Sequence, residues 1–163
     1  MKRASIAILA LFALCQMAAA TKAAASKTAA PKGDLIPKAK AFFQHYVELE
    51  HAFDPAIADL YSDQAVIKNT QYTVDGKVVP LTKPVAKYKQ VLRDYMRTKA
   101  RQIGDVSNYS NDTYTQEGNR VRIKVTRYSS IEKVSSPVSL LVGPDVTGRW
   151  LIYEELSESH LKR

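Results

Sequence analysis

An arginine on a predicted strand is one residue of this sequence that could bind a ligand. Val121, Ile123 and Val125 alternate with charged neighbours, which predicts a strand with one buried face. Continuing the alternation puts Arg127 and Ser129 on the buried side, unless a bulge reverses it. A guanidinium at the mouth of a pocket can bind a carboxylate, phosphate or sulfate through two parallel hydrogen bonds. Alternatively, the strand leaves the core there and Arg127 is solvated or paired, as charged residues usually are.

An acid on the last predicted strand could complement that arginine. Trp150, Ile152 and Glu154 share one strand face by the same two-residue period. If Trp150 belongs to the core, Glu154 points toward a cavity, and an Arg127–Glu154 pair would orient a ligand or activate a water. Alternatively, Glu154 is an exposed acid near the end of the strand, which is the usual position of a charged residue.

Basic residues spaced by four form a cationic stripe on the third predicted helix: Lys89, Arg93, Arg97 and Arg101. One interpretation is a docking surface for an anionic polymer, a lipid headgroup or an acidic partner. The alternative, favoured by the usual behaviour of charge runs, is the solvated face of an amphipathic helix. Because no aromatic side chains are interleaved as a stacking platform, we expect no nucleic-acid partner.

Residues for metal, thiol or hydrolase chemistry are scarce. Of the three histidines, His45 and His51 are six residues apart and project from different sides of a helix, while His160 lies near the C-terminus. The single cysteine, Cys15, lies in an N-terminal apolar run. The sequence contains no Gly-x-Ser-x-Gly nucleophile motif. We therefore predict no metal site, no cofactor and no assignable catalytic residue.

Three predicted helices precede most of the strands that carry these side chains. After Pro37, apolar residues recur at helical spacing as far as Phe53, and Asp54-Pro55 opens a short second helix. A third helix begins after Pro84, ends near Gln102 and includes Tyr95 in its buried stripe. The predicted strands cover residues 65–72, 78–81, 105–116, 120–133, 138–142 and 150–153. This order predicts an α+β fold, with three N-terminal helices packed on a strongly bent antiparallel sheet.

The order of elements resembles the nuclear transport factor 2-like superfamily, whose members are also called SnoaL-like, cystatin-like or cone-shaped α+β barrels. The resemblance covers residues 35–160, and its local marks are LYSDQAVI at Leu60–Ile67 and GRWLI at Gly148–Ile152. It implies a pocket between the concave sheet and the helices. It also implies that a homodimer could form through the sheet, as in many members.

Within that superfamily, FQHYV at Phe43–Val47 resembles the helix of ketosteroid isomerases that carries a tyrosine donor, which would be Tyr46. The resemblance puts the catalytic base at Asn69, which cannot act as one, and residues 137–142 lack the required second acid. Epoxide hydrolases of the superfamily are less similar, because Ser129 stands where an acid would be needed. We therefore expect Tyr46 to be a core tyrosine with a satisfied hydroxyl.

The first twenty residues are typical of an export signal. Two basic residues precede an uncharged run that ends in small side chains, which predicts cleavage near Ala20 and a periplasmic or secreted protein. Leu14, directly before Cys15, argues against a lipid-anchored cysteine. We expect a signal peptide at residues 1–20, a flexible linker at 21–34 and one domain at 35–163.

Trimming the signal and linker changes the apparent charge. Residues 1–34 hold five Lys or Arg residues and one Asp, so the net charge falls from +8 for the chain to +4 for residues 35–163. This moderate charge does not identify a nucleic-acid binder, and no later segment is apolar enough to span a membrane.

The sequence thus predicts an exported domain that binds a small, partly apolar or anionic molecule. Two alternatives stay open: a SnoaL-like hydrolase, dehydratase or isomerase that uses a polar pole, and an interaction module that uses the basic helix or the outer sheet. We expect binding rather than catalysis. The candidate pocket residues are Tyr46, Asn69, Tyr95, Arg127, Trp150 and Glu154.

Overall fold

A computed structural model describes residues 33–160. The predicted signal peptide and most of the predicted linker lie outside the described residues, as do residues 161–163. The elements in order are α1 (Ile36–His51), the 3₁₀ helix η1 (Pro55–Leu60), β1 (Tyr61–Tyr72), β2 (Val78–Lys83), α2 (Val85–Tyr95), the π-helix η2 (Met96–Ala100), α3 (Arg101–Ile103), β3 (Ser107–Glu117), β4 (Arg120–Ser129), β5 (Ser135–Pro144) and β6 (Trp150–His160).

Local sequence signals explain how the helices begin and end. A proline occupies the first turn of α1, where no backbone donor is needed. Asp54 caps η1, because its carboxylate accepts a 2.8 Å hydrogen bond from the backbone N–H of Ala56. The third predicted helix comprises α2, η2 and α3 without interruption, and it stops at Gly104, whose φ of 65° is left-handed.

Six strands form one sheet in the order β2-β1-β6-β5-β4-β3. Four of the neighbouring pairs are antiparallel, but β1 and β6 run parallel, so the expectation of an antiparallel sheet is wrong for this pair. No short hairpin joins β1 to β6; most of the domain separates them, and their connection does not impose an antiparallel arrangement. Several boundaries also differ: β1 begins at Tyr61, β4 ends at Ser129 and β6 continues to His160.

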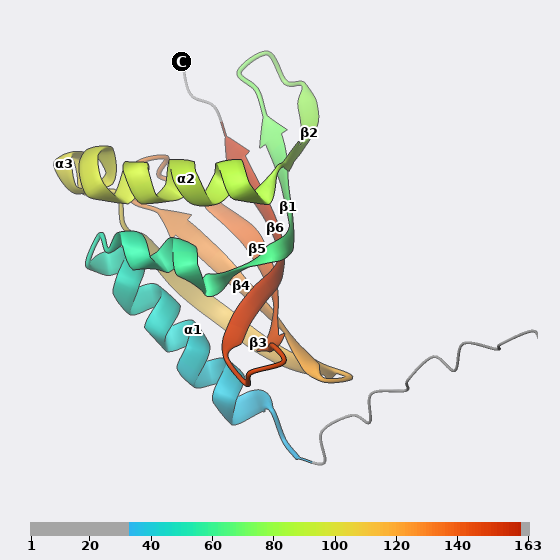
Figure 1. Cartoon of the computed structure of the whole chain (residues 1–163). Coiled ribbons are helices and arrows are strands. Elements are labelled where there is room, and N and C mark those ends of the chain that lie inside the picture. Colours follow the sequence, from blue (N-terminus) through green and yellow to red (C-terminus); the bar gives the residue numbers. More distant parts are fainter. Residues whose placement is uncertain (1–32, 161–163) are drawn as a thin grey trace, which may run out of the picture.

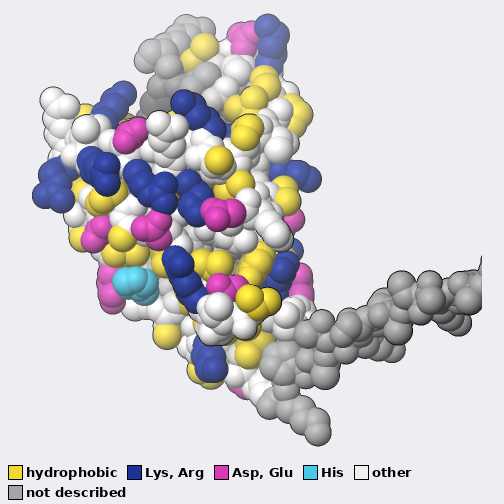
Figure 2. All heavy atoms as spheres, in the orientation of Figure 1, with side chains coloured by type: hydrophobic (Ala, Val, Ile, Leu, Met, Phe, Trp, Pro, Cys, Tyr) yellow, Lys and Arg dark blue, Asp and Glu magenta, His cyan; other side chains and the backbone are white. Residues whose placement is uncertain are grey.

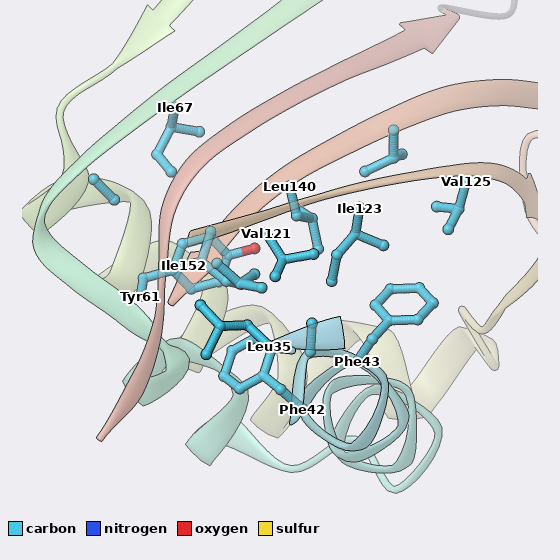
Figure 3. Packing of buried hydrophobic residues seen from close by; sticks show 14 residues of the cluster. Leu35, Phe42, Phe43, Tyr61, Ile67, Val121, Ile123, Val125, Leu140 and Ile152 are labelled. Atoms are coloured by element: carbon cyan, nitrogen blue, oxygen red, sulfur yellow. The ribbon is translucent and has the colours of Figure 1, made fainter. Parts of the chain in front are cut away.

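The sheet curves around the helices, with α1 and α2 lying against its concave side (Figure 1). Buried apolar residues from α1 and from four strands fill the space between α1 and the sheet (Figure 3). They include Phe42, Phe43, Tyr61, Ile67, Val121, Ile123, Leu140 and Ile152. No helix within residues 33–160 combines the length and apolarity needed to cross a membrane.

Candidate ligand-binding cavity

A partly open cavity of about 170 Å³ lies between the helices and the sheet. Its polar walls come from three directions: α1, the α2–η2 helix and the concave face of strands β3, β4 and β6. The residues that line it include Tyr46, Glu50, Tyr88, Tyr95, Tyr109, Arg127 and Glu155. The apolar core described above occupies the other part of the concave face, so the polar groups gather at one end of the domain interior.

Glu155 provides a buried carboxylate on the sheet side, with only 8% of its surface exposed. The hydroxyl of Tyr61 donates a 2.5 Å hydrogen bond to Oε2 of Glu155. The Tyr88 hydroxyl lies 3.2 Å from the same oxygen and 3.3 Å from Oε1. Two phenol donors therefore hold this carboxylate, which is what a buried charge requires.

Glu50 provides a second buried carboxylate from the last turn of α1, with 7% of its surface exposed. The helix end is held to β3, because Nε2 of the adjacent His51 lies 2.8 Å from the backbone carbonyl oxygen of Ser107. Oε2 of Glu50 is buried without a hydrogen-bond partner among the described residues. Burial raises the pKa of Glu50, and the nearby Ser107 and Tyr109 hydroxyls only partly oppose this.

Arg127 lies on the inward face of β4, as the two-residue period of Val121, Ile123 and Val125 predicts. Its Nη2 donates a 3.3 Å hydrogen bond to the backbone carbonyl of Glu158, but its buried Nε has no partner within residues 33–160. Burial lowers the pKa of Arg127, but the neighbouring phenols and acids outweigh it, and the net shift is upward. The guanidinium therefore stays charged.

Tyrosine hydroxyls supply neutral donors around the two carboxylates. The ring of Tyr46 stacks on Phe43 at 6.0 Å and meets Tyr109 edge to face at 6.3 Å, while Tyr61 and Tyr88 meet edge to face at 5.3 Å. Burial is the main cause that raises the pKa of Tyr46, Tyr61, Tyr88 and Tyr109, and nearby glutamates add to it. These phenols therefore keep their protons at physiological pH.

The structure does not bring Arg127 and Glu154 together, so the predicted polar pair is wrong. Tyr153 is an extra residue in β6: Ile152 pairs with Val142, and Glu154 pairs with Leu141. This bulge shifts the alternation by one residue, turning Glu155 inward and Glu154 outward. Glu154 instead pairs with Arg122.

The other candidate pocket residues lie in different places. Tyr95 lines the cavity, and its hydroxyl donates to the carboxylate of Asp105. Asn69 is buried but lies outside the cavity lining; its amide bonds the hydroxyls of Ser157 and Ser159 at 3.1 and 2.8 Å. Trp150 packs in the apolar core, with its ring 6.3 Å from that of Phe42. Of the predicted set, the structure therefore brings Tyr46, Tyr95 and Arg127 together.

Most of the predicted cationic stripe is engaged within the domain. Lys89 Nζ lies 2.6 Å from Asp63, and Arg93 lies 2.5 Å from Asp59. Arg101 donates to the carbonyl of Ala52 at 3.2 Å. The π-helix η2 also lies between Lys89 and Arg101, so the four-residue spacing of the stripe does not keep all its members on one line of a regular α-helix.

Neither carboxylate of the cavity is among the residues that the sequence predicts for a pocket. The signal for Glu50 is present, because it follows Phe43 by seven residues and Tyr46 by four, on the inward face of α1. The signal for Glu155 is absent, because neither the sequence period nor composition locates the bulge at Tyr153. Among residues 33–160, the structure contains no cluster of three or more His, Cys, Asp or Glu residues that could hold a metal ion.

No protein-family model matches the sequence, and a search of the curated proteins finds no match. Solved structures do match. A nuclear transport factor 2-like protein of unknown function from Shewanella oneidensis is 11% identical, with a TM-score of 0.58 over 77% of this chain and 100% of that chain. A nuclear transport factor 2-like protein from Cytophaga hutchinsonii is 7% identical, with a TM-score of 0.54 over 78% and 99%.

A third similar structure is a protein of unknown function with a cystatin-like fold from Nostoc punctiforme. It is 12% identical to this chain, with a TM-score of 0.50 over 76% of this chain and 89% of that chain. At such low identities the likeness concerns the fold. The chain has the α+β fold of the nuclear transport factor 2-like superfamily.

Proposed function

We propose that this domain binds a small molecule with an anionic group in the cavity between its helices and its sheet. The single observation that carries the proposal is that Glu50 Oε2 and Arg127 Nε are both buried, lack protein partners among the described residues and belong to residues lining one cavity. Leaving such atoms unpaired costs about 1–3 kcal/mol each, and more when the group is charged. A bound molecule that pairs with them recovers this free energy.

The chemistry of the walls defines the kind of ligand. Arg127 is matched by a carboxylate, phosphate or sulfate oxygen, as the sequence predicts. Glu50 is matched by a hydroxyl or amine hydrogen, because an ionised carboxylate only accepts hydrogen bonds. We therefore propose a small hydroxy acid or amino acid as the ligand class.

The cavity volume restricts the size of this ligand. A dry protein cavity of about 150 Å³ holds benzene, which has six non-hydrogen atoms. The 170 Å³ of this cavity therefore suits a molecule of similar size.

Catalysis is a second candidate function, and the environment of Glu50 is the observation that favours it. Its raised pKa and unpaired oxygen suit a general acid or base. Arg127 would then orient an anionic substrate beside it. Turnover of a bound hydroxy acid, lost in Glu50→Gln while binding persists, would distinguish this enzyme from a binding protein.

We propose, from the N-terminal residues, that the domain works in the periplasm or outside the cell after cleavage near Ala20.

A homodimer through the sheet also stays a proposal. It is supported by two exposed apolar side chains on neighbouring strands, Val66 of β1 at 42% and Leu156 of β6 at 38%. The interaction-module alternative through the basic helix is less well supported, because three of the four stripe residues have partners within the domain.

Isothermal titration calorimetry tests the ligand proposal. The probes are glycolate, lactate, glycerate, glycine and serine, with ethanol and propanol as uncharged comparisons. We expect at least one of the charged probes to bind, and Arg127→Gln to weaken it about 10- to 100-fold, the equivalent of a charged hydrogen bond.

The matched control is Arg122→Gln, because Arg122 lies on the same strand, outside the cavity lining, in an ion pair with Glu154. We expect this variant to bind as the wild type does. Equal affinity in Arg127→Gln and the wild type would contradict the proposal, as would binding of none of the charged probes.

A further inference from the structure

A second hollow lies between α2 and the end of β2. It is a groove of about 580 Å³, within the roughly 300–1,000 Å³ typical of small-molecule sites. Its lining consists of Leu81, Thr82, Lys83, Pro84, Lys87, Tyr88, Val91, Leu92 and Tyr95. On the molecular surface, hydrophobic side chains gather beside the row of Lys and Arg that runs over α2 (Figure 2).

The helix α2 separates this groove from the inner cavity. Tyr88, Leu92 and Tyr95 line both hollows, and no residue of α2 is fully buried. Val91 faces the groove with 51% of its surface exposed. The groove side of α2 thus combines one exposed apolar side chain, Val91, with Tyr88, Leu92 and Tyr95, which are partly buried.

Charge in the groove is confined to one end. Lys83 and Lys87 lie where α2 begins, and the lining contains no Asp or Glu. Within residues 33–160 neither lysine is in an ion pair, whereas Lys89, on the same helix, is paired with Asp63. The positive end of the α2 dipole adds to this charge.

The other end of the groove is apolar. Val91, Leu92 and Tyr95 line it, and from Pro84 to Tyr95 the helix advances about 16 Å at 1.5 Å per residue. A ligand that fits has one anionic head and one apolar tail. We propose that the groove binds a single-chain fatty acid, with its carboxylate at Lys83 and Lys87 and its alkyl chain along Val91 and Leu92.

An alkyl chain suits this lining better than an acidic peptide does. A peptide carries N–H and C=O groups that need hydrogen-bond partners, and few side chains on the apolar part of the groove can supply them. An alkyl chain has no such groups. The proposal is independent of the small-molecule ligand proposed for the inner cavity, because it uses different charged residues.

Dodecanoate, kept below its micelle concentration, tests the groove in a calorimetric titration of the purified protein. We expect binding that tightens from octanoate to decanoate to dodecanoate, by up to about fourfold for each buried methylene. We expect Val91→Asp to weaken dodecanoate binding at least tenfold, because it puts a negative charge on the alkyl path.

Two matched controls separate the groove from general surface effects. Val146→Asp makes the same substitution at a fully exposed residue outside the groove, and it should leave binding unchanged. The double substitution Lys83→Gln and Lys87→Gln should weaken dodecanoate binding but not dodecanol binding. Lys38→Gln with Lys68→Gln removes the same charge from exposed residues elsewhere and should change neither.

Several results would overturn the proposal. Equal binding of dodecanoate by Val91→Asp and the wild type would do so. So would loss of binding in Arg127→Gln with retention in Val91→Asp, because the fatty acid would then occupy the inner cavity. A dimer that Val91→Asp dissociates in sedimentation experiments would show that a second copy covers the groove.

Discussion

Two unpaired atoms distinguish the cavity from an ordinary buried polar cluster. Glu155 is satisfied by Tyr61 and Tyr88, so it fixes those phenols in place. Glu50 Oε2 and Arg127 Nε lack such partners among the described residues. The first carboxylate is therefore structural, and the other two groups are the ones available to a ligand.

Glu50→Gln should make the protein relatively more stable as the pH rises. Burial raises the pKa of Glu50 above 4.5, so the folded state holds its proton more tightly than the unfolded state. The stability contributed by this group is complete below about pH 4.5 and is lost as the pH rises through the raised pKa. Glutamine has no proton to lose.

Thermal unfolding from pH 4 to pH 8 checks this prediction. The melting temperature of Glu50→Gln minus that of the wild type should increase above pH 4.5 and level off above the raised pKa. A constant difference for Glu50→Gln would show that burial does not perturb this carboxyl.

At the scale of elements, the β6 bulge decides which glutamate reaches the cavity. Because Tyr153 is the extra residue, deleting it restores regular pairing and leaves Glu155 facing inward. We expect the deletion variant to fold and to keep the Tyr61–Glu155 contact. Its melting temperature should fall modestly, since the domain loses the 3.3 Å hydrogen bond from Tyr153 to Pro144 and the contact of the Tyr153 ring with Arg120.

Deletion of Leu156 is the matched comparison, because it shifts the face of every later residue and breaks the Asn69–Ser157 hydrogen bond. Circular dichroism should show a much lower melting temperature than for the Tyr153 deletion. A Leu156 deletion as stable as the Tyr153 deletion would contradict the assigned register.

The spacing of apolar residues, together with the turn-forming residues, was sufficient to predict most elements from the sequence. Apolar spacing identified α1, and the alternation in β4 correctly put Arg127 on the inward face. Two features could not be predicted from these patterns. The parallel β1–β6 pair depends on contacts between chain segments far apart, and the bulge depends on pairing with a neighbouring strand. The wrong prediction that Glu154 faces the cavity follows directly from the unpredicted bulge.

At the scale of the whole molecule, the domain has two hollows, one on each side of α2. The inner cavity is small and polar, whereas the outer groove is larger and apolar with a cationic end. Because Tyr88, Leu92 and Tyr95 form a shared wall, displacement of α2 by a ligand on one side would alter the other. The arrangement supports a binding protein more directly than a dedicated catalyst.

The most direct test of the central proposal is native mass spectrometry of the protein after expression with its own N-terminus and purification from the periplasm. We predict a folded chain that carries one small anionic molecule, the same molecule in Arg122→Gln, and none in Arg127→Gln. A wild-type protein of bare chain mass, or an Arg127→Gln variant with the same bound molecule, would contradict a ligand held by Arg127 in this cavity.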